Sequence, residues 1–266
     1  MTLFGWGYAP WLAVVSVFWL VAERLRPARP HQRTLRSQLA NDAFYLLFNG
    51  VGWSVVMGAL GLVSWIAPKV RAVTAPLLPV EGWLDGRSFV VQVLVFLLVS
   101  DFVQWCIHNL LHRVPFLWQF HKVHHSIHEM DWIGNFRFHW MEHVVYRSLG
   151  FVPVVVLLGG DWPPLLFAYV FGTFWGHFNH ANVDVGIGPL GYVFNSPRMH
   201  MWHHDASSEG GQAKNFGIVL SCWDWLFGTA YWPRDRAPSR IGYEGDAEMP
   251  RDVLRQELFP LTRRTG

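Results

Sequence analysis

Long apolar stretches separated by short polar segments make up the N-terminal part of the chain. Residues 1–22 and 43–68 carry no charged side chain, and residues 88–107 carry a single one. Each stretch is long enough to cross the roughly 30 Å hydrocarbon core of a membrane as a helix that rises about 1.5 Å per residue. The first stretch lacks a basic segment before it and a small-residue cleavage site, so we interpret it as a membrane anchor and not as a signal peptide.

The pattern changes after residue 107. Residues 108–143 are polar, aromatic and rich in histidine, whereas residues 148–160 and 162–178 form two shorter apolar runs bounded by glycines and prolines. Two short runs so close together indicate a helical hairpin that need not cross the whole membrane. A second histidine-rich segment follows, and the chain ends in a charged tail without apolar periodicity, which we expect to lie on the surface.

These patterns predict an all-α protein, an integral membrane bundle of about four to five helices with a cytosolic histidine-rich cap. The arginine-rich residues 23–36 should be cytoplasmic by the positive-inside rule, and counting helices from there puts both histidine-rich segments on the same side. The same result holds if the hairpin is a buried pair of soluble helices. We divide the chain into N-terminal membrane helices and loops (1–87), a histidine-rich domain (88–232) and a charged tail (233–266).

The composition agrees with a membrane protein. Hydrophobic residues make up 52% and charged residues 15% of the chain, whereas about 25% of residues are charged in soluble domains. The 16 tryptophans and 20 phenylalanines suit membrane interfaces, where aromatic rings accumulate. A net charge of only +2 argues against a nucleic-acid partner. Two cysteines exclude a disulfide framework and a cysteine-rich zinc module.

Histidine is concentrated in one part of the chain, since 13 of the 14 histidines lie between His108 and His204. His108 and His112 are four residues apart and would share one face of a helix. The spacing H-x-x-H-H occurs twice, and on a helix its last two histidines point about 100° apart, so that one helix can offer ligands to two metal ions. We therefore predict a centre of two metal ions. Its candidate ligands are His108, His112, His121, His124, His125, His177, His180, His200, His203 and His204.

Other metal chemistries fit these residues less well. The carboxylate-bridged di-iron bundle needs Glu-x-x-His motifs and zinc proteases need H-E-x-x-H, and neither motif occurs here. A single catalytic zinc takes three protein ligands, which would leave most histidines unused. A transporter would place its ligands in the middle of the membrane instead of at helix ends. Imidazole binds iron, zinc and copper alike, so a zinc-dependent membrane hydrolase with the same histidines stays open as an alternative.

Residues beside the histidine motifs have several candidate roles. Asp101 lies seven residues before His108, so it either accepts the second N–H of a ligand histidine or makes a polar contact within the bundle. His139 is a candidate ligand, outer hydrogen-bond partner or substrate contact. His128 and His143 belong to no repeated spacing, and we expect that they do not bind metal.

The segment DFVQWCIHNLLHRVPFLWQFHKVHHS, residues 101–126, closely resembles the signature of the fatty acid hydroxylase/sterol desaturase superfamily. These proteins are integral-membrane, non-haem di-iron oxygenases with one H-x-x-x-H and two H-x-x-H-H motifs. Later segments are also similar to the family pattern, in the same order over residues 95–232. They are RFHWMEH, FNHANV, SPRMHMWHHDAS and NFGIVLSCWDWLFGT. Asn109 and Trp140 replace an arginine and a proline that are frequent in the family, which is expected to reshape the substrate entrance while the ligands are kept.

The resemblance implies a ligand set and a reaction. It carries over nine of the ten candidate histidines, and His177 has the least certain counterpart. It implies two iron ions, with zinc as a substitute, and hydroxylation or desaturation of a lipid by O₂. The sequence contains no flavin, nicotinamide or haem motif, so we expect the electrons to come from a ferredoxin- or cytochrome-type partner. That partner could dock on a basic surface formed by Arg113, Lys122, Arg137 and Lys214.

Overall fold

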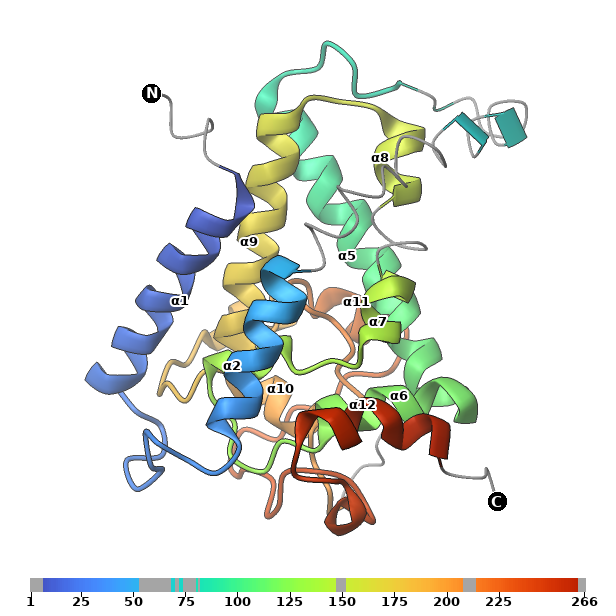
Figure 1. The fold of residues 1–266 in the computed structure, drawn as a ribbon. Helices are drawn as coiled ribbons and strands as arrows, with labels where there is room; N and C mark the ends of the chain where they lie inside the picture. Colours follow the sequence, from blue (N-terminus) through green and yellow to red (C-terminus); the bar gives the residue numbers. More distant parts are fainter. Residues whose placement is uncertain are drawn as a thin grey trace.

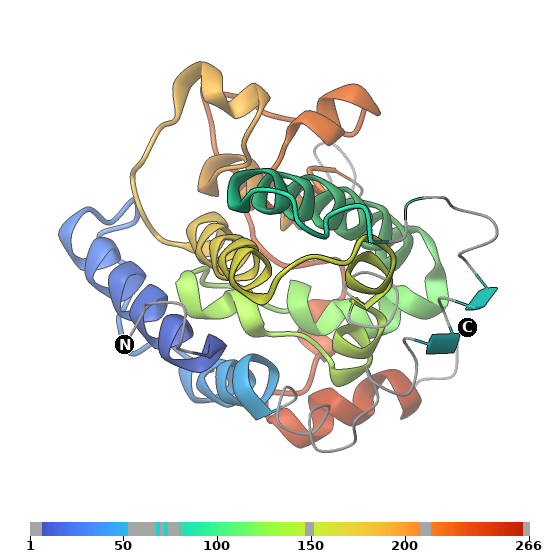
Figure 2. The same cartoon turned by 90° about the horizontal axis from the view of Figure 1, so that it is seen from above.

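Three long helices lie side by side and finish at the same end of the molecule (Figure 1). They are α1 (Tyr8–Leu25), α5 (Phe89–Arg113) and α9 (Trp162–His180). Seen from above, α9 lies between the other two (Figure 2), and it packs against both. The computed structural model describes residues 7–52, 68, 69, 72, 73, 80, 82–146, 152–207 and 214–262.

The local sequence explains where α5 and α9 begin. The Ser88 hydroxyl accepts a hydrogen bond from the backbone N–H of Val91 at 3.4 Å and caps α5. Proline occupies the first turn of α9. Backbone N–H groups of a first turn have no acceptor within the helix, so a proline there costs no hydrogen bond. Helices α1 and α5 are long and apolar enough to cross a membrane. The outer face of α5 exposes Leu94 and Leu98, as expected for a helix that faces lipid.

Aromatic packing holds α1 against α9. The indole N–H of Trp19 donates a hydrogen bond to the carbonyl of Phe174 at 3.0 Å, and the Trp19 ring stacks on Phe178 with centroids 5.2 Å apart. Val15 and Trp132 are buried in the same cluster. A large aromatic side chain buries much apolar surface and packs in a specific geometry. This contact therefore fixes the position of α1 relative to α9.

Shorter elements gather around the lower end of the long helices (Figure 1). Helix α8 instead lies near the start of α9. The helices are α2 (Leu39–Leu47), α6 (Pro115–His125), α7 (Trp140–Val145), α8 (Val152–Leu158), α10 (Pro197–His203), α11 (Cys222–Leu226) and α12 (Val253–Thr262). The π-helical turn η2 (Phe48–Gly52) and the 3₁₀ turns η3 (Trp132–Phe136), η5 (Gly188–Tyr192) and η6 (Asp246–Glu248) complete them.

The described residues form an all-α fold, as predicted, with strand pairing limited to isolated bridges. The first apolar stretch corresponds to α1, the third to α5, and the second run of the hairpin to α9. Residues 53–67 of the second stretch lie outside the described residues, so the number of membrane helices stays a prediction. The charged tail contains α12, which packs on α6 through Phe259, so this tail is more ordered than its lack of periodicity suggested.

A buried ion-pair network connects the arginine-rich segment to the chain after α6. Arg36 pairs with Asp42 and with Asp131, and Arg137 pairs with Asp42. All four side chains are buried or nearly so. A buried charge needs a hydrogen-bonded partner of opposite sign, so these pairs hold residues 23–36 at the same end of the molecule as the histidine-rich elements.

Candidate metal centre

Four helices deliver histidines to one region at the lower end of the bundle. Helix α5 supplies the pair four residues apart, and α6 folds back against α5 directly after it. Pro115 opens α6 at its first position, and the hydroxyl of Ser196 accepts a hydrogen bond from the backbone of Met199 to cap α10. The end of α9 supplies His180. The residues at which α6 and α10 begin therefore determine where their histidines lie.

Nine histidines form two groups, within each of which the candidate ligand nitrogens lie within 4.8 Å of one another. The five-histidine group consists of His108, His112, His121, His125 and His203. The four-histidine group consists of His124, His180, His200 and His204. Nitrogen–nitrogen distances of 3.1 and 3.2 Å occur in the first group and of 3.3 and 3.2 Å in the second.

Each H-x-x-H-H motif is divided between the two groups. In α6, His121 and His125 point to the five-histidine group while His124 points to the four-histidine group. In α10 the division is reversed, because His203 joins the five-histidine group and its two neighbours in the motif join the other. Residues four apart share a helix face, whereas adjacent residues diverge by about 100°. The spacing thus explains why two groups form side by side.

The five-histidine group is oriented by a carboxylate and two backbone carbonyls. His121 Nδ1 lies 2.5 Å from Glu142 Oε2. His108 Nδ1 donates to the carbonyl of Phe216 at 2.9 Å, and His203 Nδ1 donates to the carbonyl of Lys214 at 2.7 Å. An acceptor at Nδ1 fixes the tautomer that leaves Nε2 free for a metal.

Two members of the four-histidine group are oriented by backbone carbonyls. His124 Nδ1 donates to the carbonyl of Arg137 at 3.1 Å, and His180 Nδ1 donates to the carbonyl of Gly176 at 2.9 Å within α9. Arg137 is itself held by its buried ion pair with Asp42. The ion-pair network therefore reaches this group through a single backbone carbonyl.

The protonation state of the histidines suits metal binding. Burial lowers the pKa values of His121, His124 and His125 well below their ordinary range, and neighbouring imidazoles lower them further. The same causes act on the pKa values of the three histidines of α10 and its cap. All six are therefore neutral at pH 7, and neutral imidazole is the form that coordinates a metal.

Several ring nitrogens are buried without a hydrogen-bond partner among the described residues. They are His200 Nδ1, His203 Nε2 and both nitrogens of His204. A buried polar atom without a partner is costly. All three residues belong to the two histidine groups, where bound metal ions could take up such nitrogens. The donor set of neutral nitrogens fits iron, zinc or copper.

Glu142 and a loop around Asn215 orient the centre, and neither was among the candidates from the sequence. Asn215 has a left-handed backbone with φ of 51°, and its amide bonds the carbonyl of Met199. The Asp224 carboxylate accepts hydrogen bonds from the backbone of Phe216 and Gly217. These contacts aim the loop carbonyls at the histidines. In the sequence, the glutamate of RFHWMEH and the aspartate of the closing WDWLFGT segment were the features that could have indicated these roles.

Three other candidates, His177, His139 and Asp101, lie outside both groups. The Nε2 of His177 is 3.3 Å from the Ser16 hydroxyl and its Nδ1 is 3.1 Å from the Asn135 amide. His139 caps α7 through Nδ1, and its Nε2 donates to the carbonyl of Glu257 at 2.7 Å. The structure therefore gives these two histidines hydrogen bonds that hold the fold together.

Asp101 anchors a loop. Its carboxylate accepts hydrogen bonds from the backbone N–H groups of Val219 and Leu220 and from the indole of Trp223. No described histidine is among its hydrogen-bond partners, so of the two suggested roles the structure shows the polar contact. The docking surface expected from the sequence needs a correction as well. Arg137 is 1% and Lys214 6% exposed, so neither can contact a partner.

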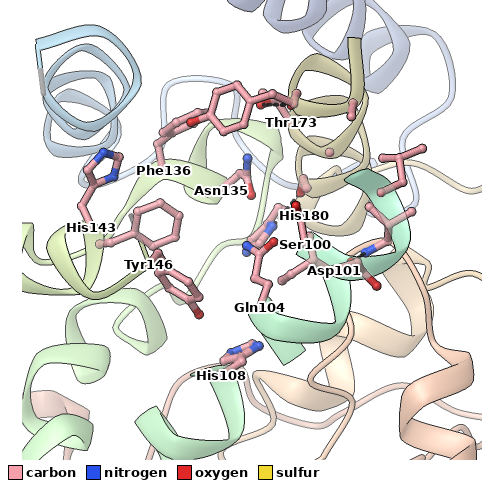
Figure 3. A pocket seen from close by; sticks show the side chains of 18 of the residues that line it. Ser100, Asp101, Gln104, His108, Asn135, Phe136, His143, Tyr146, Thr173 and His180 are labelled. Atoms are coloured by element: carbon pink, nitrogen blue, oxygen red, sulfur yellow. Dashed lines mark hydrogen bonds between the residues drawn. The ribbon is translucent and has the colours of Figure 1, made fainter. Parts of the chain in front are cut away.

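A cavity of about 210 Å³ opens beside the histidines, between α5, α9 and the segment from η3 to α7 (Figure 3). His108, His121, His124 and His180 line one part of it, so both groups reach it. Phe96, Leu97 and Leu165 line another part. The cavity can therefore hold an apolar molecule with one of its carbons near the histidines.

Comparison with known proteins identifies the family of the chain. Residues 93–229 match the model of a family described as fatty acid hydroxylase. The ornithine lipid hydroxylase OlsE of Rhizobium tropici is 31% identical over 97% of this chain and 75% of its own length. The alkylglycerol monooxygenase of Caenorhabditis elegans is 27% identical over 55% of this chain, but the match covers only 28% of that longer protein. No solved structure matches the chain.

Proposed function

The chain belongs to the fatty acid hydroxylase family, and from that premise we propose that it is a membrane-bound di-iron oxygenase. It hydroxylates or desaturates a lipid with O₂ and electrons from a separate protein. The observation that carries the proposal is the pair of neighbouring histidine groups that share one cavity. Related proteins are named for hydroxylation of ornithine lipid and oxidation of alkylglycerol, and both substrates are lipids.

The two groups would hold one iron ion each. The five-histidine group provides one donor set and the four-histidine group the other, without His177. Iron bound there would supply the activation of O₂ and the removal of hydrogen from a lipid C–H bond. Zinc could take the same positions, because imidazole binds both metals, but it would not supply the redox chemistry.

The chain itself positions the reactants. Glu142 holds the Nδ1 proton of His121, and loop carbonyls hold those of two more histidines. These contacts would keep the imidazoles oriented towards a bound metal. The apolar side chains around the cavity exclude bulk water and hold a lipid chain in place. Hydroxylation and desaturation would then differ in which C–H bonds lie nearest the histidines.

Electrons would enter near His112, the only incompletely buried member of the two groups. Its ring centroid lies 4.9 Å from that of Trp118, and the exposed Arg113 is its neighbour in sequence. Hydroxylation uses two electrons and two protons and releases one oxygen atom as water. We propose a ferredoxin- or cytochrome-type protein as the donor, since such carriers deliver electrons one at a time.

The membrane orientation follows from the arginine-rich segment. Helices α1 and α5 would cross the bilayer, and the histidine groups lie at the same end as residues 23–36. Positive charge favours the cytoplasmic side. We therefore propose that the metal centre faces the cytoplasm, beneath a bundle of about four to five membrane helices.

Lipid turnover by the iron-loaded protein in lipid nanodiscs tests the proposal. With a chemical reductant, a ferredoxin and ¹⁸O₂, we expect a hydroxylated or desaturated lipid by mass spectrometry, with ¹⁸O in any hydroxyl group. Strict anaerobiosis should abolish the product. Hydrolysis of a lipid by the zinc-loaded protein without O₂ would contradict the proposal and favour the membrane hydrolase.

A further inference from the structure

We propose that Gln104 and Ser100 bind a hydrogen-bonding group of the lipid, so that the oxidised carbon lies within a few bonds of that group. This inference rests on the proposed function and narrows its substrate class. It favours a polar lipid whose amide, ester or hydroxyl group lies next to the reacting carbon. An unsubstituted hydrocarbon chain oxidised far from any polar group would fit the site poorly.

Ser100, Gln104 and His108 form a polar line along the cavity side of α5. They stand at intervals of four residues and therefore share one helix face. All three line the cavity, and in Figure 3 the Gln104 amide points away from His108, to the side on which His180 lies. The rest of this part of α5 is apolar apart from Asp101.

The side chains of Gln104 and Ser100 form no hydrogen bond with any residue that the structure describes. Two other polar side chains of the lining, Asp101 and Asn135, have partners within the protein. The Asp101 carboxylate accepts three hydrogen bonds, and the amide of Asn135, which also lines the cavity, contacts His177 at 3.1 Å. A polar side chain inside a membrane helix is costly and usually marks a substrate pathway. The missing partners point to the occupant of the cavity.

The length of the cavity along α5 suits an extended chain. Its lining along α5 runs from Phe96 to His108, a rise of about 18 Å at roughly 1.5 Å per residue. An extended hydrocarbon chain of that length can therefore lie along α5 with one end beside His108. The part around Phe96 and Leu165 is apolar and suits a hydrocarbon tail.

The distance between the polar side chains and the histidines sets the position of oxidation. Gln104 precedes His108 by one helical turn, which is about 6 Å along the axis. A lipid group bound to the Gln104 amide would therefore lie only a few bonds from the carbon beside the histidines. The amide both donates and accepts hydrogen bonds, so it can bind a carbonyl, an ether oxygen, an N–H or a hydroxyl group.

Competition binding in nanodiscs tests the inference without turnover. A fluorescent fatty acid bound to the full-length protein is displaced by an amide, a methyl ester or an alkane of equal chain length. We expect the wild-type protein to bind the amide and the ester about tenfold more tightly than the alkane, as one well-formed hydrogen bond allows. Gln104→Leu should lose most of this preference and keep its affinity for the alkane, and Ser100→Ala should lose a smaller part.

Leu98→Ala, on the outer face of α5, is the matched control and should keep the wild-type preference. Unchanged iron content shows that each variant is folded. Equal binding of amide and alkane by the wild type, or an unchanged preference in folded Gln104→Leu, would overturn the inference. The position of the product hydroxyl gives a second test, because a hydroxyl far from the polar group would also overturn it. If the wild-type protein bound no iron, the proposed function would be contradicted. The binding preference would still decide the inference on Gln104 and Ser100.

Discussion

The five-histidine group and the four-histidine group differ in what orients their imidazoles and in how close they lie to the surface. The first is backed by a carboxylate and by two carbonyls of the 214–216 loop. The second is backed by one carbonyl of α9 and by that of Arg137. His112 leaves the first group incompletely buried, whereas every member of the second is buried.

This difference indicates separate tasks for the two groups. A carboxylate makes its imidazole a stronger donor than an amide carbonyl does. His112 is the member of the five-histidine group that solvent can reach, and under the proposed function electrons would enter there. The four-histidine group depends on helix α9 and on the buried ion pairs. We therefore expect the five-histidine group to respond to local substitutions and the four-histidine group to respond mainly to changes in the fold.

Removal of one imidazole from each group should give the largest effects. We expect His203→Ala and His200→Ala each to lose about half of the bound iron and more than about 100-fold in lipid turnover, because losing a ligand costs more than losing its outer hydrogen bond. Metal analysis and product quantification check this. The exposed His128 provides the control variant His128→Ala, which should keep both. Full activity in either ligand variant would break the assignment of two metal ions.

Glu142→Gln should distinguish the two groups more finely. Loss of the carboxylate behind His121 should weaken metal binding in the five-histidine group by about 10- to 100-fold and leave the four-histidine group unchanged. A chelator titration followed by metal analysis should then show a weaker first phase and an unaltered second one. Glu257→Gln, whose carboxylate lies 3.3 Å from His139 outside both groups, is the matched control. An equal effect on both phases would remove the distinction.

The pH dependence of the metal-free protein should report the burial of the imidazoles. Burial holds the pKa values of His200 and His204 well below 6.5 in the folded protein, so the unfolded chain binds more protons once the pH falls below about 6.5. The free energy of unfolding should therefore decrease towards acid, by up to about 1.4 kcal/mol per pH unit for each such histidine. Denaturant titrations from neutral to mildly acidic pH measure the slope. His204→Gln should reduce it, and a flat profile would contradict the neutral buried state.

His177→Gln should have the smallest effect. The side chain contacts Ser16 and Asn135 outside both groups, so the variant should keep its iron and lose about 1 kcal/mol of stability, as expected for a neutral hydrogen bond. Thermal unfolding and metal analysis check both parts. A loss of iron comparable to that of His200→Ala would return His177 to the set of ligands.

The sequence predicted those features that depend on helical periodicity. The apolar stretches located α1, α5 and α9, and the H-x-x-H-H spacing led to two neighbouring groups of imidazoles because the angle between adjacent residues on a helix is fixed. Which group each histidine joins depends on how α6 and α10 face each other. That arrangement is a feature of the tertiary structure, and the spacing of the histidines in the sequence does not reveal it.

Residues that act through single long-range contacts could not be assigned in the same way. Glu142 reaches His121 only because α7 packs against α6, and Asp101 meets the backbone of residues 219 and 220 far along the chain. The burial of Arg137 arises from its pairing with Asp42, a contact between segments that composition alone would place on a charged surface.

The metal content of protein purified anaerobically without added metal tests the central claim most directly. Elemental analysis combined with X-ray absorption at the iron edge counts the ions and identifies their ligands. The two histidine groups predict about two iron ions per chain, each coordinated mainly by imidazole nitrogen. A single ion per chain, or iron that stays fully bound when either His203 or His200 is replaced, would contradict the account.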